Sequence, residues 1–454
     1  MPERLGEGVG VARLIGLIGC TLLALSLAGA MMSMAWAGNS PAARQEPLPD
    51  PLTLTEALSY ADAPHPELDL VRAAVDSARA GVLDAASSSG VRSYLELTPQ
   101  WVNPSSDPSR GSIDDSNVRL LLTKRLYDFG QTRALTYSAK AMVSAQRQLY
   151  FNARQQRRLE IIKRFFDVLL ADAHSAFDTE ATAYNYVSFD KARDRRKLGQ
   201  ISDVDLLAFE DRYQQALVKR TESQAAQRFT RTQLAVALNH PDDLPDNLVR
   251  PDLPQLDHPV PNYKTILQEA LKANPVVLAL RDQVRSAKEK IVAAQRQDRP
   301  ILEAELEAAG LRRESNGRND MRATLNLHIP IYQNGLVEAA VAQARAQLRR
   351  AEAGLASVRQ RLRTTLLGLV EQVNNLKAAR KAARVRTAYR DLYADRSRSL
   401  YNLEIKTDLG DAMARLTEAQ WQAAKVDYEL VLTWAKIDAL TGKLIATSSK
   451  ETAK

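Results

Sequence analysis

The feature that most constrains the fold is a long run with almost no helix-breaking residue. After Asp128-Phe129-Gly130, no glycine occurs until Gly199 and no proline until Pro241. The stretch from Gln131 to Lys197 holds about 67 residues, and as an α-helix it would span roughly 100 Å. The mean helix of a globular protein holds only about 11–12 residues. We therefore expect an elongated helical structure rather than an ordinary compact domain.

The apolar residues of the long runs are spaced as in coiled coils. Two neighbouring seams occur in the first run, so that helix is expected to pack on two neighbours. Such stripes are nearly always packing surfaces, and we assign them no ligand. The first seam comprises Leu159, Ile162, Phe166 and Leu169, the second Ile161, Phe165 and Val168, and the later run repeats the pattern at Leu348, Ala351, Leu355, Val358, Leu362 and Leu369.

The sequence is a duplication. The segment LYDFGQTRA from Leu126 recurs as IYQNGLVEA from Ile331, and each closes an alternating run and opens a helical one. A helical lead precedes each copy, LTEALSYA in the first half and ILQEALKA in the second. The first repeat is predicted at 38–240, with strands at about 91–103 and 117–127 and a helical hairpin at 131–239. A Pro-rich connector follows at 241–262. The second repeat is predicted at 263–443, with strands at about 300–311 and 321–332 and a helical hairpin at 336–441, and a tail occupies 444–454.

Each of the four strand segments alternates apolar with polar residues, so each has one apolar face. A soluble hairpin with that face on a core is the ordinary interpretation. No compact layer elsewhere in the chain is available to cover these faces, and strands of about ten residues with this alternation suit a membrane β-barrel. Four strands cannot close a barrel, and an open edge is not tolerated in lipid. The sequence therefore predicts a barrel shared between subunits, with Leu97, Trp101, Leu122, Leu325 and Leu327 toward lipid and Glu96, Glu303, Glu305 and Asn326 toward water.

The first 37 residues have the features of a secretory signal peptide. Basic residues precede an apolar segment at 14–30, and Ala35-Trp36-Ala37 offers a cleavage site before Gly38. An uncleaved membrane anchor is the alternative, because the apolar run is long for a signal. Cys20, the only cysteine, follows a segment similar to a lipoprotein cleavage box, so lipidation there stays open. Beyond this segment no apolar run reaches the roughly 20 residues of a spanning helix.

Composition and motifs argue against nucleic-acid binding and against catalysis. The net charge of +8 is modest beside 62 basic and 54 acidic residues, which follow helical faces. The five histidines are scattered, and no phosphate-binding glycine motif is present. No pair of carboxylates lies in a recognisable catalytic setting. We expect no enzyme activity, no cofactor and no metal site.

With its duplicated long helical runs and alternating strands, the sequence resembles the TolC family of bacterial outer-membrane efflux proteins. The resemblance is carried, in order, by LTLTEALSYA, RLYDFGQTRA, RRKLGQISDVDLLAFEDR, IPIYQNGLVEAA, YNLEIKTDLGDAMARLTEAQ and IDALTGKL. It implies a mainly α fold with a small β part, in which each chain gives four strands to one trimeric, twelve-stranded β-barrel. An α-helical barrel of long coiled-coil helices continues that barrel through the periplasm.

The resemblance also implies positions for two hairpin tips that dock a periplasmic adaptor. The first tip is Leu198, Gly199 and Ser202, where a glycine turn and a serine cap also explain these residues structurally. At the second tip, Glu404 stands where the family has glycine, and Thr407 occupies the hydroxyl position. The turn geometry of the second tip is therefore open.

A pore gate is implied at Asp408 and Asp411, which are three residues apart and share a helix face. Alignment backward from Tyr428 and Gly442 places them on the family's paired aspartates, whereas alignment forward from Tyr401 places Gly410 and Met413 there. We prefer the first alignment because it keeps carboxylates, and two solvated or capping aspartates are the alternative.

A closed-state lock is implied between Asp205 of the first tip and Tyr401 and Lys406 near the second. A carboxylate, a phenol and an ammonium can join two helices by charge-assisted hydrogen bonds that a docking partner breaks. Ordinary surface pairing explains the same residues.

The predicted function is a passive outer-membrane exit duct for tripartite efflux or type I secretion, gated at its periplasmic end. The expected partners are two further copies, a periplasmic adaptor, an inner-membrane transporter and outer-membrane lipid. The alternative is a soluble periplasmic coiled-coil scaffold or adaptor. The substrate, whether drug, metal ion or polypeptide, is not encoded in any motif of this sequence.

Overall fold

The computed structural model describes residues 47–102, 113–114, 116–243, 245–311, 321–403 and 408–445. The predicted signal peptide at 1–37, Cys20 and the tail beyond residue 445 lie outside these ranges. The chain divides into two units, 1–48 and 49–454, and the elements described below belong to the second.

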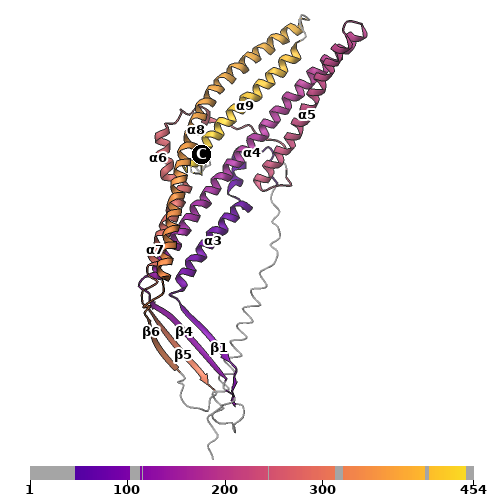
Figure 1. Ribbon diagram of the computed structural model, residues 1–454. Helices are drawn as coiled ribbons and strands as arrows, with labels where there is room; N and C mark the ends of the chain where they lie inside the picture. The colour runs from indigo at the N-terminus through magenta and orange to yellow at the C-terminus, as the bar shows by residue number, and fades with distance from the viewer. Residues whose placement is uncertain are drawn as a thin grey trace, which may run out of the picture. The chain divides into compact units, whose positions relative to one another are not determined.

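The elements of the first half run from a short helical lead through a hairpin of strands into two long helices (Figure 1). They are α2 (Leu54–Ser59), the 3-10 turn η1 (Tyr60–Asp62), α3 (Pro66–Ser87), β1 (Val91–Thr98), β2 (Trp101–Val102), β3 (Ile113–Asp114), β4 (Asn117–Tyr127), α4 (Gln131–Lys197) and α5 (Asp203–Leu238). The second half follows the same order, with η3 (Pro254–Asp257), α6 (Tyr263–Ala273), α7 (Pro275–Ala294), β5 (Ile301–Leu311), β6 (Met321–His328), α8 (Leu336–Asn402) and α9 (Leu409–Leu440).

The longest helices of the two halves correspond residue by residue. Helix α4 begins at 131 and α8 at 336, while α4 ends at 197 and α8 at 402, so the offset is 205 residues at both ends. Each helix starts directly after a left-handed glycine, Gly130 with φ 87° and Gly335 with φ 79°. Glycine accepts this conformation without the steric cost that a side chain brings. These two glycines turn the chain from strand into helix.

The helices form a single layer of four rows. The first row holds α3 and α5, the second α4, the third α7 and α9, and the fourth α8. The paired helices follow one another end to end. Where α5 ends and α3 begins, the Asn239 side chain donates to the Pro64 carbonyl at 3.2 Å. Where α9 ends and α7 begins, the Asn274 side chain donates to the Leu440 carbonyl at 3.0 Å. Each short helix therefore extends the line of a longer one, and four helical rows lie side by side.

The core of this layer lies along the seams between rows. Ile161, Phe165 and Val168 are fully buried, and Ile162 and Phe166 of the neighbouring seam are buried as well. Burying one such side chain stabilises the fold by about 1.5–3 kcal/mol. The second predicted seam of α4 is therefore buried throughout, whereas the first is buried at Ile162 and Phe166 and only half-buried at Leu159 and Leu169. Within the ranges described, no helix combines the length and the apolar character needed to cross a membrane.

The four main strands form one antiparallel sheet in the order β1-β4-β5-β6. Strand β4 pairs with β1 through Leu95↔Leu120 and with β5 through Leu122↔Leu306, and β5 pairs with β6 through Ala304↔Leu325. The predicted fold class, long helices with four strands per chain, is confirmed. Strands β1 and β6 are the two edges of this sheet.

Two strands are shorter than the sequence predicts, and proline explains both. Strand β1 ends at Thr98 instead of continuing to 103, because Pro99 has no N–H to donate, and pairing resumes only in the short β2. Strand β6 ends at His328 instead of 332, two residues before Pro330. The polar connections at 103–112 and 312–320 lie outside the described residues.

Candidate functional site

One face of the sheet carries a lattice of charges. Each of its cross-strand ion pairs joins residues that lie directly opposite each other in the register. Direct neighbours on one face of a sheet interact across about 5 Å, so this placement favours opposite charges. The pairs are Arg119 with Glu96 at 2.9 Å, Arg125 with Glu303 at 3.3 Å and Arg322 with Glu307 at 3.7 Å.

The opposite face of the sheet is apolar and exposed. Leu97 retains 64% of its accessible surface and Leu325 retains 69%. The register places Leu95, Leu120 and Leu306 on this same face, and all three are exposed as well. The register also puts the exposed Lys124 on this face, near the end of β4 that leads into α4. An apolar surface of this kind marks a contact with lipid or protein. The register separates the two sets of side chains as the predicted facing requires, except for Trp101, which lies in the separate β2–β3 pair. The identity of the surrounding medium stays a prediction.

The first tip, between α4 and α5, is closed by local hydrogen bonds. Gly199 takes the left-handed conformation with φ 74°. Ser202 caps α5, because its hydroxyl accepts from the Asp205 N–H at 3.1 Å while the Asp205 carboxylate accepts from the Ser202 N–H at 3.2 Å. This reciprocal capping box lowers the pKa of Asp205. Leu198, at the end of α4, exposes 73% of its surface.

The start of α9 is held by contacts with α8 instead. The Tyr393 hydroxyl donates to Asp408 Oδ2 at 3.0 Å, and the Asp408 carboxylate raises the pKa of that phenol. Asp408 is the N-terminal cap residue of α9 by position, yet its side chain makes no capping hydrogen bond to the helix. One turn further on, Ala412 and Leu416 are buried against Ala394. The second hairpin is therefore closed by packing between its two helices.

Asp411 is paired within its own helix. The Arg415 Nε donates to Asp411 Oδ2 at 2.7 Å, and the carboxylate raises the pKa of the guanidinium. Between the two aspartates, Gly410 lies so close to Tyr184 of α4 that an added Cβ would stand 3.0 Å from the ring. The structure thus brings Asp408 and Asp411 to one helix start. Reasoning from sequence missed both partners, although the four-residue spacing from Asp411 to Arg415 was a usable signal.

The residues predicted to form a lock are not joined within one chain. No hydrogen bond or ion pair between described side chains links Asp205 to Tyr401, which is half exposed. Helices α5 and α8 are the opposite edges of the helical layer, so α4 and α9 separate them. Lys406, Glu404 and Thr407 lie outside the described residues. The lock between Asp205 and Tyr401 therefore stays a prediction.

The described residues contain no cluster of three or more His, Cys, Asp or Glu side chains arranged to hold a metal ion. The only close approach between His174 and a carboxylate is a pair with Asp178 at 3.6 Å in the same helix. His174 also stacks on Trp421 with ring centroids 4.2 Å apart. These contacts join α4 to α9 and are explained by helix packing.

Comparison with known proteins gives a relationship in sequence. The second half of the chain, residues 266–443, matches the family described as "Outer membrane efflux protein". The outer membrane protein TolC of Escherichia coli is 24% identical over 420 residues, which cover 86% of this chain and 82% of that protein.

Solved structures share the fold at lower identity. The Campylobacter jejuni CmeC outer membrane channel superposes with a TM-score of 0.70 at 13% identity, covering 88% of this chain and 89% of that one. The open state of the Neisseria gonorrhoeae MtrE outer membrane channel superposes with a TM-score of 0.68 at 16% identity, covering 86% and 89%. These relatives are channels, not enzymes, and an outer-membrane location that extends into the periplasm agrees with them. The resemblance to the TolC family of outer-membrane efflux proteins that the motifs predict is thus confirmed by the family match, by the relationship to TolC and by the shared fold.

Proposed function

We propose that three copies of this chain assemble into one outer-membrane channel that acts as the exit duct of a tripartite efflux pump or a type I secretion system. Each half, 38–240 and 263–443, would be one structural repeat of the assembly. The duct itself conducts passively, and its substrate enters through a gate at the periplasmic end.

The observation that carries this proposal is the four-stranded sheet with two free edges. Among the described strands, β1 and β6 have neighbours on one side only, and a free edge in lipid leaves backbone groups without hydrogen bonds. Pairing β6 of one copy with β1 of the next satisfies these groups and closes a barrel after three copies. The face with the Arg–Glu pairs then lines the lumen, and the apolar face meets lipid.

The helical layer supports the same closure, because its two edge rows expose large apolar side chains. A lone monomer would leave these stripes in water, whereas a ring of copies packs one edge row against the other. A soluble scaffold would not need both an exposed apolar sheet and two exposed helical edges. The stripes comprise Leu70, Leu83, Val218 and Phe229 on α3 and α5, and Val385, Tyr389 and Leu392 on α8.

The gate in this proposal consists of three copies of Asp408 and Asp411, which would converge on the tunnel axis. The Arg415 partner moderates the ring at Asp411 in each copy. The lock would join Asp205 of one copy to Tyr401 and Lys406 of its neighbour, since these residues occupy opposite edges of the layer. Docking at the tips would break that lock.

An adaptor would dock on the two tips. Leu198 and Leu403 occupy the same position after α4 and α8 and expose 73% and 67% of their surfaces. Exposed leucines at corresponding positions suit an apolar contact with a partner hairpin. Gly199, Ser202, Glu404 and Thr407 complete the proposed docking set.

Cysteine scanning of the sheet tests the proposal. With Cys20 replaced, single cysteines at positions 325 and 326 report opposite faces of β6. A membrane-impermeant thiol reagent should label position 326 in the assembled protein and leave position 325 unlabelled, because only the lumen face is wet. Equal labelling of both positions would contradict the proposed facing, and extraction of the folded protein from cells without detergent would contradict the channel.

A further inference from the structure

The helical layer contains a hollow of about 900 Å³ that the channel function leaves without a role. It reaches from Glu67 and Leu68 of α3 across α4 to Leu369 of α8 and Lys436 of α9. Pockets of about 300–1,000 Å³ are typical of sites for small organic ligands. Its size therefore suits one drug-sized molecule.

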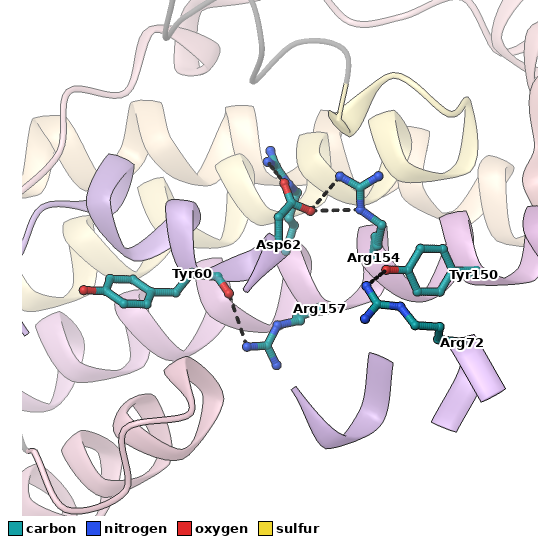
Figure 2. A network of polar contacts seen from close by, with 7 residues as sticks. Tyr60, Asp62, Arg72, Tyr150, Arg154 and Arg157 are labelled. Carbon is teal, nitrogen blue, oxygen red and sulfur yellow. Dashed lines mark hydrogen bonds and ion pairs between the residues drawn. The ribbon is translucent and has the colours of Figure 1, made fainter. Parts of the chain in front are cut away.

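The η1 turn of the first helical lead and the connector at 241–262 both lie on the other face of the layer. Asp62 of η1 accepts from Arg154 at 2.7 Å and from Arg158 at 3.1 Å, as Figure 2 shows for the surroundings of Asp62. On an α-helix, Gln156 and Glu160, which line the hollow, point about 200° away from Arg154 and Arg158 respectively. The hollow thus opens on the face without connectors.

Contacts in the second repeat also place the hollow on the face opposite the connector. His258 packs edge-on against Trp434 of α9 with ring centroids 5.8 Å apart, so Trp434 points toward the connector. Lys436 and Leu432 of the hollow are each two residues from Trp434 and therefore lie on the opposite side of α9. Because one hollow reaches both α3 and α8, which are edge rows, the layer is concave on this face. In a closed ring the concave face lines the tunnel.

The hollow has an apolar floor and an excess of positive charge. Four basic and two acidic side chains line it. Of the basic residues, Arg164 is neutralised by Glu160 at 3.6 Å and by Asp167 at 3.7 Å. Within the described ranges, Lys163 and Lys436 have no acidic partner within 4 Å, although both are exposed enough to reach a ligand.

Arg157 is the most unusual residue of the lining. It exposes 4% of its surface, and its Nε has no hydrogen-bond partner among the described residues. Its Nη2 donates to the Tyr60 carbonyl at 3.3 Å, a contact visible in Figure 2. Burial lowers the pKa of this guanidinium, because the charged form lacks water. The carboxylates of Glu67, Glu160 and Asp62 oppose this effect, so Arg157 already has anions near it and is a structural part of the wall.

A smaller hollow on the same face has a similar charge. It measures about 280 Å³ and lies among α4, α7 and α8, with Lys290 and Arg350 but no acidic residue in its lining. Met142 of this hollow and Ala153 of the larger one are eleven residues apart on α4, about three helical turns, so both face the same way. The positive character therefore continues along the concave wall.

We infer that the larger hollow binds an anionic amphiphile, a molecule with an apolar body and a sulfonate or carboxylate group, as it passes along the tunnel. The apolar floor holds the body, and the exposed Lys163 and Lys436 hold the anion. This inference rests on the proposed function, because the hollow faces a tunnel only in the closed trimer. Neighbouring copies would meet at the edge rows, so they leave the middle of the concave face open.

The test uses two fluorescent probes with the same aromatic body. 1-Anilinonaphthalene-8-sulfonate carries a sulfonate, whereas N-phenyl-1-naphthylamine does not. Both are titrated onto the purified protein in nanodiscs, with empty nanodiscs as the baseline. The wild type should bind the sulfonate probe more tightly, and K163Q/K436Q should weaken that binding about five- to tenfold while changing the neutral probe less than about twofold.

A matched control removes the same charge elsewhere. K191Q/K219Q changes two exposed lysines on α4 and α5 outside the hollow and should leave both affinities unchanged. Raising the salt from 50 to 500 mM should weaken binding of the sulfonate probe to the wild type, which tests the charge without any mutation. Equal losses in the two variants, equal losses of the two probes, or no salt effect would overturn the inference.

Single-channel conductance, recorded from the same preparations, distinguishes failure of the proposed anionic site from failure of the proposed channel function. A normal conductance with no preference for the sulfonate probe overturns the anionic site alone. Absence of a conducting trimer overturns the proposed function, and with it the position of the hollow in a tunnel wall.

Discussion

The two hairpin tips occupy equivalent places in the repeats, and their described residues are held in different ways. The first closes through the sequence itself, with left-handed Gly199, the capping box of Ser202 and Asp205, and an ion pair between Arg196 and Asp203 at 2.6 Å. At the second tip the start of α9 is held by the neighbouring helix, through the hydrogen bond from Tyr393 to Asp408.

This difference separates two mechanical properties. Contacts within ten residues keep the first tip in shape whatever its neighbours do. The start of α9 depends on the alignment of α9 with α8 and α4, so a small shift between rows changes the position of Asp408 and Asp411. In the proposed channel, both tips dock the adaptor, and the start of α9 at the second tip is also the part that moves during gating.

The gate variants should give the strongest response. In Asp408→Ala/Asp411→Ala, three copies of Arg415 lose their partners and become the main charges at the constriction. The cation-to-anion permeability ratio should fall by about tenfold or more and pass below one, because a ring of like charges sets the local ion concentration. Arg415→Gln removes the positive partner of Asp411 instead of the carboxylates, so it should increase cation selectivity. Reversal potentials in planar bilayers measure both, and an unchanged selectivity in the double variant would refute this gate.

The first tip offers a test that separates a lock from a cap. Asp205→Ala and Ser202→Ala each remove half of the capping box, and the loss of a serine cap costs about 0.5–2 kcal/mol. If Asp205 also reaches Tyr401 of a neighbouring copy, Asp205→Ala alone should raise the single-channel conductance, and Tyr401→Phe should reproduce the increase. Equal conductance in Asp205→Ala and Ser202→Ala would mean that Asp205 acts only as a cap.

A backbone substitution tests the rigidity of the first tip. Gly199→Ala forces a side chain into a left-handed conformation, while its Cβ meets no atom within 4 Å. The cost should be about 1–2 kcal/mol and purely conformational. Hydrogen exchange should show faster opening confined to the residues around 195–205. Faster exchange at the start of α9 in the same variant would show that the two tips are coupled, contrary to the proposed division.

Acid and alkali should loosen different tips. The Ser202 hydrogen bonds lower the pKa of Asp205, so its stabilisation is present above the unfolded pKa and is lost as the pH falls through the folded value. Asp408 raises the pKa of Tyr393, so that contribution is present below the unfolded pKa of about 10 and is lost as the pH rises through the folded value. Protection factors should fall at the first tip below about pH 4 and at the second above about pH 10. The opposite assignment would contradict the contacts described.

Features with a periodic signal were predictable from sequence. Two seams of α4, the alternation of Leu325 with Asn326, and the glycines before α4 and α8 all follow from spacing and residue type. The proline-limited ends of β1 and β6 were also readable, because Pro99 and Pro330 interrupt the alternating runs.

Contacts between distant residues were not predictable. The bond from Tyr393 to Asp408 depends on the crossing of two helices, which no local pattern specifies. The burial of Arg157 depends on where η1 lies over α4, and the hollow beside it depends on the curvature of the whole layer. A single sequence contains no signal for such angles.

The pairing of free sheet edges is the claim on which the channel depends. Cysteine pairs, one along β1 at 91–98 and one along β6 at 321–328, can be introduced into a chain without Cys20 and oxidised in outer membranes. At the correct register, denaturing gels should show a crosslinked ladder that stops at three chains. No crosslink at any register, or a ladder that extends beyond three chains, would contradict the closed trimer.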